Sequence, residues 1–282
     1  MIAVWMPLQR RKISFSTLPM KKNKVYFISD AHIGGGKYIR PPRVREDALI
    51  DFLRAIRKDA KCLYIVGDLF DFWFEYRSVV PAHGARVIFE LYHLVQSGTR
   101  VIYLPGNHDS WLGGYLSEQV GAELPGPFCD ISHQNCRLYV THGDIFQQNW
   151  KFELRRCILK HPLCIALFRW LHPDIGAYLA RIVSRSSDLD IREGTRKKKK
   201  TYLPLYFIKS AAEKFAEGFD FVICGHYHAL SVEPMDGGTL VVLGDWLRYD
   251  AYAVLENGEI ALKHWHTAPE KPLLTDDTGD LK

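Results

Sequence analysis

The chain has 282 residues, of which 47% are hydrophobic and 24% are charged, and this composition excludes an intrinsically disordered protein. Its net charge of +5 is too small to make the whole molecule a polycation, but residues 1–24 carry +6 and residues 151–214 carry +9, so the rest of the chain is acidic. The sequence has no apolar run of about eighteen residues, which excludes a transmembrane helix.

Residues 1–24 are predicted to be a basic, disordered leader that precedes the fold. They do not resemble a secretory signal, because their charges follow the apolar run and no small-residue cleavage site is present. The six cysteines contain no C-x-x-C pair, so we expect buried, reduced thiols in a cytoplasmic protein. These cysteines are Cys62, Cys129, Cys136, Cys157, Cys164 and Cys224.

Apolar runs rich in β-branched residues alternate with segments of helical period, as in layered α/β proteins. The predicted strands are 25–29, 63–66, 100–104, 138–141 and 221–224, and the predicted helices are 45–57, 85–96 and 113–120. After residue 225, short strands are predicted at 231–234, 239–243, 251–255 and 260–264, with hairpin turns at 236–238 and 256–258. The predicted core therefore comprises residues 25–145 and 216–268, and residues 269–282 form a flexible tail.

Residues 146–215 interrupt this alternation, because they have helical period, many Arg and Lys residues, and three prolines. We predict a basic helical insertion between two strands of the core. Its apolar residues are either helix-packing residues or a face for alkyl chains; they are Leu159, Leu163, Leu167, Phe168, Trp170, Leu171, Leu179 and Ile182. The run Lys197–Lys200 is either a solvated face or an anion contact, and the sequence leaves both open.

Five of the predicted strands end in a cluster of Asp, Asn or His. The clusters are Asp30-Ala31-His32, Gly67-Asp68-Leu69-Phe70-Asp71, Gly106-Asn107-His108-Asp109, His142-Gly143-Asp144 and Gly225-His226-Tyr227-His228. Because strands of one sheet deliver their carboxyl ends to a common edge, we expect the five clusters to meet.

Carboxylate oxygen, amide oxygen and imidazole nitrogen together are the ligands of ions such as Mn²⁺, Fe²⁺ or Zn²⁺, and the absence of Cys argues against a closed structural zinc site. The donors exceed the needs of one ion. Two divalent ions that share a carboxylate would use them all, and a hydroxide between such ions is a nucleophile at neutral pH. The sequence therefore predicts a dinuclear hydrolytic centre.

The series D-x-H, G-D-x-x-D, G-N-H-D/E, H-G and G-H-x-H resembles the calcineurin-like metallophosphoesterase superfamily. The resemblance implies a four-layer α/β/β/α sandwich, with the late hairpins in the second sheet. It assigns one metal to Asp30, His32, Asp68 and His228, and the other to Asp68, Asn107, His142 and His226. It also places His108 over the phosphate, with Asp109 behind it to fix its tautomer, and we expect Asp71 behind the ligands.

Within the superfamily, the chain is most similar to the UDP-2,3-diacylglucosamine pyrophosphatases, on the four segments Ile28–Gly34, Gly67–Trp73, His142–Asp144 and Val241–Trp246. In that family the insertion is a lid over the acyl chains. This implies release of UMP from a lipid A precursor, two ions such as Mn²⁺, and a cytoplasmic enzyme that contacts the anionic inner membrane. Candidate substrate contacts are Arg181, Arg185 and Ser186.

One residue departs from the enteric members of that family, which have Arg where this chain has His108. A related phosphodiesterase or nuclease therefore stays open as an alternative, with the basic insertion tracking a phosphate backbone. The run Arg192–Thr201 contains no aromatic residue, so base stacking on it is unsupported. A non-catalytic scaffold on the same fold would have lost several ligands, and this chain has lost none.

Overall fold

The computed structural model describes residues 22–35, 40–147, 150–179, 182 and 203–266. Residues 1–21 of the predicted leader, the tail, the run Lys197–Lys200 and the candidates Arg181, Arg185 and Ser186 lie outside these residues. The end of the leader is ordered, contrary to the prediction: Nζ of Lys22 donates to the carbonyl oxygen of Ser97 at 2.8 Å, and Lys24 begins the first strand. Within the described part, no helix is both long enough and apolar enough to cross a membrane.

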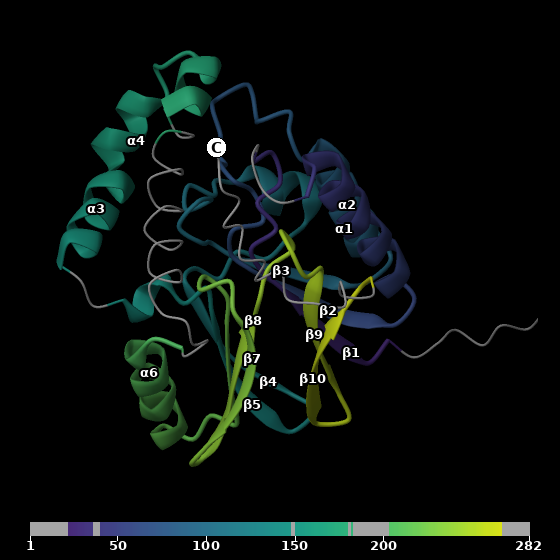
Figure 1. The fold of residues 1–282 in the computed structure, drawn as a ribbon. Coiled ribbons are helices and arrows are strands. Elements are labelled where there is room, and N and C mark those ends of the chain that lie inside the picture. Colours follow the sequence, from purple (N-terminus) through teal and green to yellow (C-terminus); the bar gives the residue numbers. More distant parts are fainter. Residues whose placement is uncertain (1–21, 36–39, 148–149, 180–181, 183–202, 267–282) are drawn as a thin grey trace, which may run out of the picture.

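Two five-stranded mixed sheets form the centre of the molecule (Figure 1). The first has the order β10-β9-β1-β2-β3, with β1 (Lys24–Ile28), β2 (Ala60–Val66), β3 (Arg100–Leu104), β9 (Ala251–Glu256) and β10 (Glu259–His264). The second has the order β4-β5-β6-β8-β7, with β4 (Phe128–His133), β5 (Cys136–Thr141), β6 (Phe221–Cys224), β7 (Leu230–Met235) and β8 (Gly238–Leu243).

The central strands are apolar beyond their first one or two residues because both of their faces are covered. On β1, for example, Val25 and Phe27 point into a core between the two sheets, whereas Tyr26 and Ile28 point into a core under the helices. Helices α1 (Pro42–Ile56) and α2 (Ala85–Gln96) cover the outer face of the first sheet, and α6 (Leu205–Ala216) covers the second. The predicted four-layer α/β/β/α sandwich is confirmed.

Most of α6 falls within the predicted insertion but packs on the second sheet as part of the sandwich, so the insertion ends earlier than predicted. The rest of its described part contains α3 (Trp150–Lys160), α4 (Pro162–Phe168) and a helical segment at 173–179. Phe168 fixes α4 to the core, because its ring packs 4.7 Å from the ring of Phe74 and 4.9 Å from that of Trp111. The Trp111 indole N–H also donates to the carbonyl of Leu159 in α3, at 2.8 Å. These contacts attach the insertion next to the loop that follows β2. That the insertion acts as a lid over a substrate stays a prediction.

Three features of the fold differ from the prediction. Strand β4 was not predicted, since only Cys129 and His133 are buried in it and it forms by pairing with β5. The helix expected over 113–120 is one π-helical turn at Leu116–Val120. The hairpin β9–β10 extends the first sheet rather than the second, because β9 pairs with β1. All six cysteines are free, but only Cys62, Cys129 and Cys224 are buried as expected; Cys136 and Cys164 are half-buried and Cys157 is exposed.

Candidate metal centre

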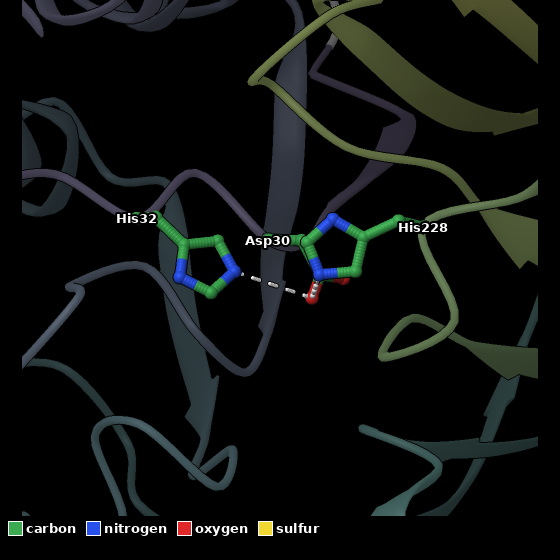
Figure 2. A group of neighbouring side chains, drawn as sticks. All are labelled: Asp30, His32 and His228. Atoms are coloured by element: carbon green, nitrogen blue, oxygen red, sulfur yellow. Dashed lines mark ion pairs between the residues drawn. The ribbon is translucent and has the colours of Figure 1, made fainter. Parts of the chain in front are cut away.

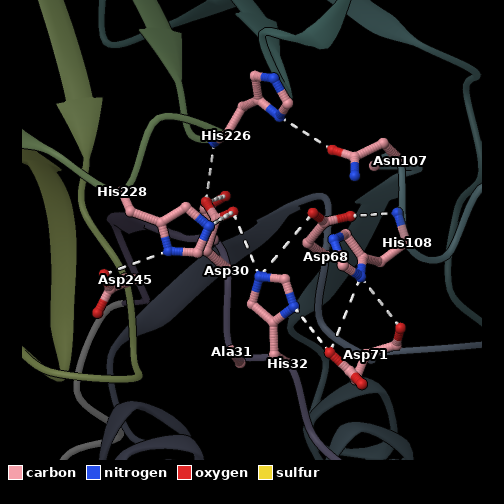
Figure 3. Close-up of polar contacts among 12 residues, drawn as sticks. Asp30, Ala31, His32, Asp68, Asp71, Asn107, His108, His226, His228 and Asp245 are labelled. Carbon is pink, nitrogen blue, oxygen red and sulfur yellow. Dashed lines mark hydrogen bonds and ion pairs between the residues drawn. The ribbon is translucent and has the colours of Figure 1, made fainter. Parts of the chain in front are cut away.

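The five clusters meet, but not at the edge of a single sheet. Strands β1, β2 and β3 of the first sheet lead into Asp30, Asp68 and Asn107, whereas β5 and β6 of the second sheet lead into His142 and His226. The side chains that follow these strands converge on one another (Figure 3). The centre therefore lies across the junction of the two sheets, which corrects the expectation of one common edge.

The backbone that carries these side chains is unusual. Nine described non-glycine residues have a positive φ, and five of them are predicted metal ligands. These are Asp30 at 55°, His32 at 44°, Asp68 at 53°, His226 at 67° and His228 at 55°. Such backbone costs free energy and persists where the surrounding structure requires it, most often at functional sites. This clustering is evidence for function that the sequence did not reveal.

One group of donors surrounds Asp30 (Figure 2). Its Oδ2 accepts hydrogen bonds from the Ser29 hydroxyl at 2.5 Å and from the backbone N–H of His226 at 3.0 Å. Its Oδ1 is buried and accepts no hydrogen bond from the described residues, but Nε2 of His228 and Nε2 of His32 lie 3.3 and 3.8 Å away. One oxygen is thus fixed by the fold, and the other faces two imidazole nitrogens.

A second group forms around Asn107 and His142. The Oδ1 of Asn107 lies 3.2 Å from Nε2 of His142 and 2.9 Å from Nδ1 of His226. Nδ1 of His142 lies 2.9 Å from the carbonyl oxygen of Val66. Because a carbonyl only accepts, Nδ1 carries the proton, and in a neutral ring Nε2 presents its lone pair to the group. His142 is therefore held in the tautomer that a metal ligand needs.

Asp68 lies between the two groups. Its Oδ1 accepts from the backbone N–H of His108 at 2.8 Å, while its Oδ2 lies 3.3 Å from Nε2 of His142 and 3.9 Å from Nε2 of His32. One oxygen thus faces a histidine of each group. Gly106 allows this approach, because a Cβ there would lie 2.1 Å from Asp68 Oδ1. The geometry fits a carboxylate shared by two ions.

The electrostatics of the centre favour cations. Burial alone would raise the pKa of Asp68, but His142 and His108 outweigh this effect and hold it well below its usual range. For Asp30, burial is likewise outweighed by His228 and His32, and the pKa falls to about 2. Burial and the neighbouring His142 lower the pKa of His226 to about 3, so its ring is neutral. Two buried carboxylates thus stay anionic. Although burial opposes it, they raise the pKa of His32 and His142 well above the usual range, so these two rings carry the positive charge that bound ions would replace.

The residues fit divalent ions. Three sets of carboxylate and imidazole donors each lie within 4.8 Å: Asp30 with His32 and His228, Asp30 with Asp68 and His142, and His32 with Asp71 and His108. The first two contain only predicted ligands and overlap at Asp30. Oxygen and imidazole donors without thiolate suit Mn²⁺, Fe²⁺ and open zinc sites.

His108 and Asp71 lie beside the first group. Nδ1 of His108 is 3.1 Å from the carbonyl oxygen of Asp71, and Oδ1 of Asp71 is 3.4 Å from Nδ1 of His32 (Figure 3). Asp71 thus contacts one predicted ligand through its carboxylate and His108 through its backbone. This agrees with the expected place of Asp71 behind the ligands.

Asp109 does not support His108, which corrects the expectation that it fixes the tautomer of that ring. Its fully buried carboxylate accepts from the backbone N–H groups of Gly106 at 2.8 Å and Asp68 at 3.2 Å, and from the hydroxyl of Tyr103. Asp109 therefore joins the loops after β2 and β3 to each other. Asp71 occupies the place beside the His108 ring that Asp109 was expected to take.

Sequence reasoning also missed Asp245. This residue stands in a segment that was singled out for family resemblance, yet no role was expected for it. Its buried Oδ2 lies 3.3 Å from Nδ1 of His228. The available signal was an Asp in the turn after a buried strand, which is the position shared by the predicted ligands.

Comparison with known proteins agrees with this geometry. A family model described as calcineurin-like phosphoesterase matches residues 23–230. The UDP-2,3-diacylglucosamine hydrolase of Porphyromonas gingivalis is 32% identical over 262 residues, which cover 86% of this chain and 97% of that protein. Proteins of the same name from Vibrio parahaemolyticus and Stenotrophomonas maltophilia are 28% and 30% identical, covering 78% and 81% of this chain and 89% and 92% of their own.

Among solved structures, an archaeal phosphodiesterase covers 86% of this chain and 99% of its own, at 13% identity and a TM-score of 0.44. The family assignment does not depend on that weak likeness. It depends on a family model that spans most of the chain and on a relative above 30% identity whose whole length is nearly covered. The chain belongs to the calcineurin-like metallophosphoesterase family and is a metal-dependent hydrolase.

Proposed function

We propose that this hydrolase cleaves the diphosphate of UDP-2,3-diacylglucosamine with water, giving UMP and 2,3-diacylglucosamine 1-phosphate. The observation that carries the proposal is the pair of donor groups on either side of Asp68, which suits two divalent ions and hence the attack of water on phosphorus. The shared name of relatives at 28–32% identity supports the choice of substrate.

In this proposal the two groups hold one ion each and Asp68 contacts both. The ligands are Asp30, His32, Asp68 and His228 for one ion, and Asp68, Asn107, His142 and His226 for the other. Bound ions would neutralise phosphate oxygens and activate water. We propose Mn²⁺, because carboxylate and amide oxygens make up much of the donor set and no thiolate is present.

His108 is proposed to act on the substrate. Its Nδ1 faces the Asp71 carbonyl and therefore carries a proton, and this contact directs Nε2 to the opposite side of the ring. We propose that a protonated Nε2 donates to a phosphate oxygen or to the leaving oxygen, where negative charge develops during cleavage. Asp71 orients the ring in this account.

The test is a Mn²⁺-supplemented assay that follows UMP release from UDP-2,3-diacylglucosamine, with bis(p-nitrophenyl) phosphate as the second substrate. His108→Ala is expected to lose UMP release. His264→Ala is the matched control, because His264 also directs Nδ1 to a carbonyl, that of Tyr249 at 2.8 Å, but lies on β10 outside the centre.

Three results are informative. UMP release that disappears only in His108→Ala supports the proposal. If only the diester is hydrolysed, the protein is still a phosphoesterase but its natural substrate is a different one. Nucleic acids and cyclic nucleotides would then be tested. No turnover of either substrate by Mn²⁺-loaded protein contradicts the proposed function.

The insertion presents a candidate surface for the acyl chains. Five of the eight residues of its predicted apolar face are exposed: Leu163, Leu167, Trp170, Leu179 and Ile182, with Trp170 87% exposed. Trp150, Leu154 and Ile158 of α3 were not in that prediction but are exposed too, and we refer to them with Leu163, Leu167 and Trp170 as the apolar stripe. Exposed apolar patches of this kind mark interaction sites. Residues 150–179 also carry five Lys or Arg against two acidic residues, which suits an anionic surface. We propose that the stripe contacts acyl chains, of the substrate or of the membrane.

Vesicle binding and kinetics separate these two sources. The double variant L167S/W170S is compared with Phe89→Ser, since Phe89 on α2 and Leu167 are both 60% exposed. Loss of sedimentation with phosphatidylglycerol vesicles, with KM unchanged, indicates the membrane. A rise in KM for long-chain but not short-chain substrate indicates the substrate. If the double variant matches Phe89→Ser in both assays, the stripe has neither role.

A further inference from the structure

The loop after β8 places a carboxylate directly behind a predicted metal ligand. Asp245 is fully buried, and its Oδ2 lies 3.3 Å from Nδ1 of His228 (Figure 3). Arg248 anchors the same carboxylate: its backbone N–H donates to Oδ1 at 2.8 Å, and its Nε and Nη2 lie 3.1 and 3.0 Å from Oδ2. Both oxygens are therefore fixed, and one of them faces the imidazole.

This contact determines which nitrogen of His228 carries the proton. An ionised carboxylate only accepts hydrogen bonds, so Nδ1 must donate to Asp245. In the neutral ring, Nε2 then presents its lone pair, and it lies 3.3 Å from Oδ1 of Asp30. A metal binds the unprotonated nitrogen of such a ring.

The loop also holds the other side of the same group. The backbone N–H of Trp246, the residue after Asp245, donates to the carbonyl oxygen of Asp30 at 3.1 Å. Two neighbouring residues of one loop thus contact two predicted ligands that lie almost 200 positions apart in the chain, Asp30 and His228. Neither contact reaches the group formed by Asn107, His142 and His226.

We propose that Asp245 is a positioning residue that keeps His228 in the tautomer and orientation required to bind the ion beside Asp30. Arg248 holds the Asp245 carboxylate in place but does not act on the ion. The inference rests on the proposed function, because it requires an ion at Asp30, His32 and His228. It predicts an effect on one of the two ions only.

The experiment measures Mn²⁺ binding to the full chain by titration calorimetry, with electron paramagnetic resonance to distinguish coupled pairs of ions from single ions. In Asp245→Ala, one site should weaken about 10- to 100-fold. At limiting Mn²⁺, the signal of the coupled pair should give way to that of a single ion. Asp245→Asn should fall between this variant and the wild type, because an amide oxygen can still accept from Nδ1 of His228.

Two controls separate positioning from a structural role. Arg248→Ala removes the side-chain contacts with Asp245 but keeps the backbone N–H of residue 248 on Oδ1 and the contact of Asp245 with His228, so the same site should weaken much less than in Asp245→Ala. Asp130→Asn removes a carboxylate from a similar pair with Arg137, at 3.1 and 2.7 Å, on the surface and without a histidine. It should bind two ions as the wild type does.

The outcomes are distinct. Equal loss in Asp245→Ala and Arg248→Ala, or wild-type affinity in Asp245→Ala, overturns the inference. If circular dichroism shows that Asp245→Ala does not fold, the test uses Asp245→Asn instead. Wild-type Mn²⁺ affinity in Asp245→Asn then overturns the inference. If the wild type itself binds fewer than two ions, the proposed function fails instead.

Discussion

Gly225 gives a prediction whose size follows from the structure. The residue does not have a positive φ, so a substitution there is limited by space and not by backbone conformation. In Gly225→Ala the new Cβ would lie 1.9 Å from Oγ of Ser29 and 2.5 Å from Oδ2 of Asp30, whereas ordinary contacts begin at 3.4 Å. The Ser29 hydroxyl or the Asp30 carboxylate must therefore move.

The cost has two parts. The Ser29 hydroxyl lies 2.5 Å from Asp30 Oδ2 and 2.7 Å from the carbonyl oxygen of Val66, so its displacement leaves a buried acceptor unsatisfied, at about 1–3 kcal/mol. Overpacking adds about 1–3 kcal/mol. We therefore expect Gly225→Ala to lower the free energy of unfolding by roughly 2–6 kcal/mol. A moved Asp30 should also weaken Mn²⁺ binding.

Urea unfolding of metal-free protein measures the first effect, and Mn²⁺ titration measures the second. Gly114→Ala is the matched control, because its Cβ would meet only the end of the Glu118 side chain, at 2.6 Å, and that flexible group can turn away. We expect this control to stay within about 0.5 kcal/mol of the wild type. The steric argument is refuted if Gly225→Ala unfolds at the same urea concentration as Gly114→Ala.

Further predictions concern stability, pH and the insertion. Removing bound Mn²⁺ with a chelator should lower Tm, since an ion at 100 times its Kd adds about 2.7 kcal/mol; an unchanged Tm in scanning calorimetry would contradict ion binding to the folded chain. Burial, with Lys61 and Arg100 nearby, lowers the pKa of His133, so below about pH 6.5 the unfolded chain binds a proton that the folded chain does not. The free energy of unfolding should therefore decrease as pH falls from about 7.5 to 5.5, and less so in His133→Gln; equal pH dependence in the two proteins would contradict this assignment. Phe168→Ala should weaken local docking of α4 by about 2–4 kcal/mol, seen as faster hydrogen exchange there than in Trp111→Phe, without loss of bound metal.

The strands that carry the centre were predictable because their signal is local. A strand covered on both faces is apolar at every position, and Leu63–Val66 and Phe221–Cys224 follow this pattern. The polar cluster after each strand is equally local. The division of these strands between two sheets was not predictable, because a doubly covered strand has the same composition in either sheet.

Features that depend on distant contacts were missed. Strand β4 has little apolar pattern of its own and exists through its pairing with β5. The role of Asp245 depends on its contact with His228, which is 17 residues away along the chain and separated from it by two strands and a turn. Asp109 was misassigned because the family resemblance placed it behind His108, whereas the backbone turns its carboxylate towards Tyr103 and the loop after β2.

The placement of the centre across two sheets has a consequence for biogenesis. The first sheet supplies Asp30, Asp68 and Asn107 early in the chain, but the partners His226 and His228 come after the insertion, and β8, which carries the Asp245 loop, comes later still. A chain synthesised only as far as the insertion therefore has five of the seven predicted donors and lacks His226 and His228. The complete donor set is therefore present only after β6 and the loop that follows it have been synthesised, and a chain truncated within the insertion would lack two predicted ligands.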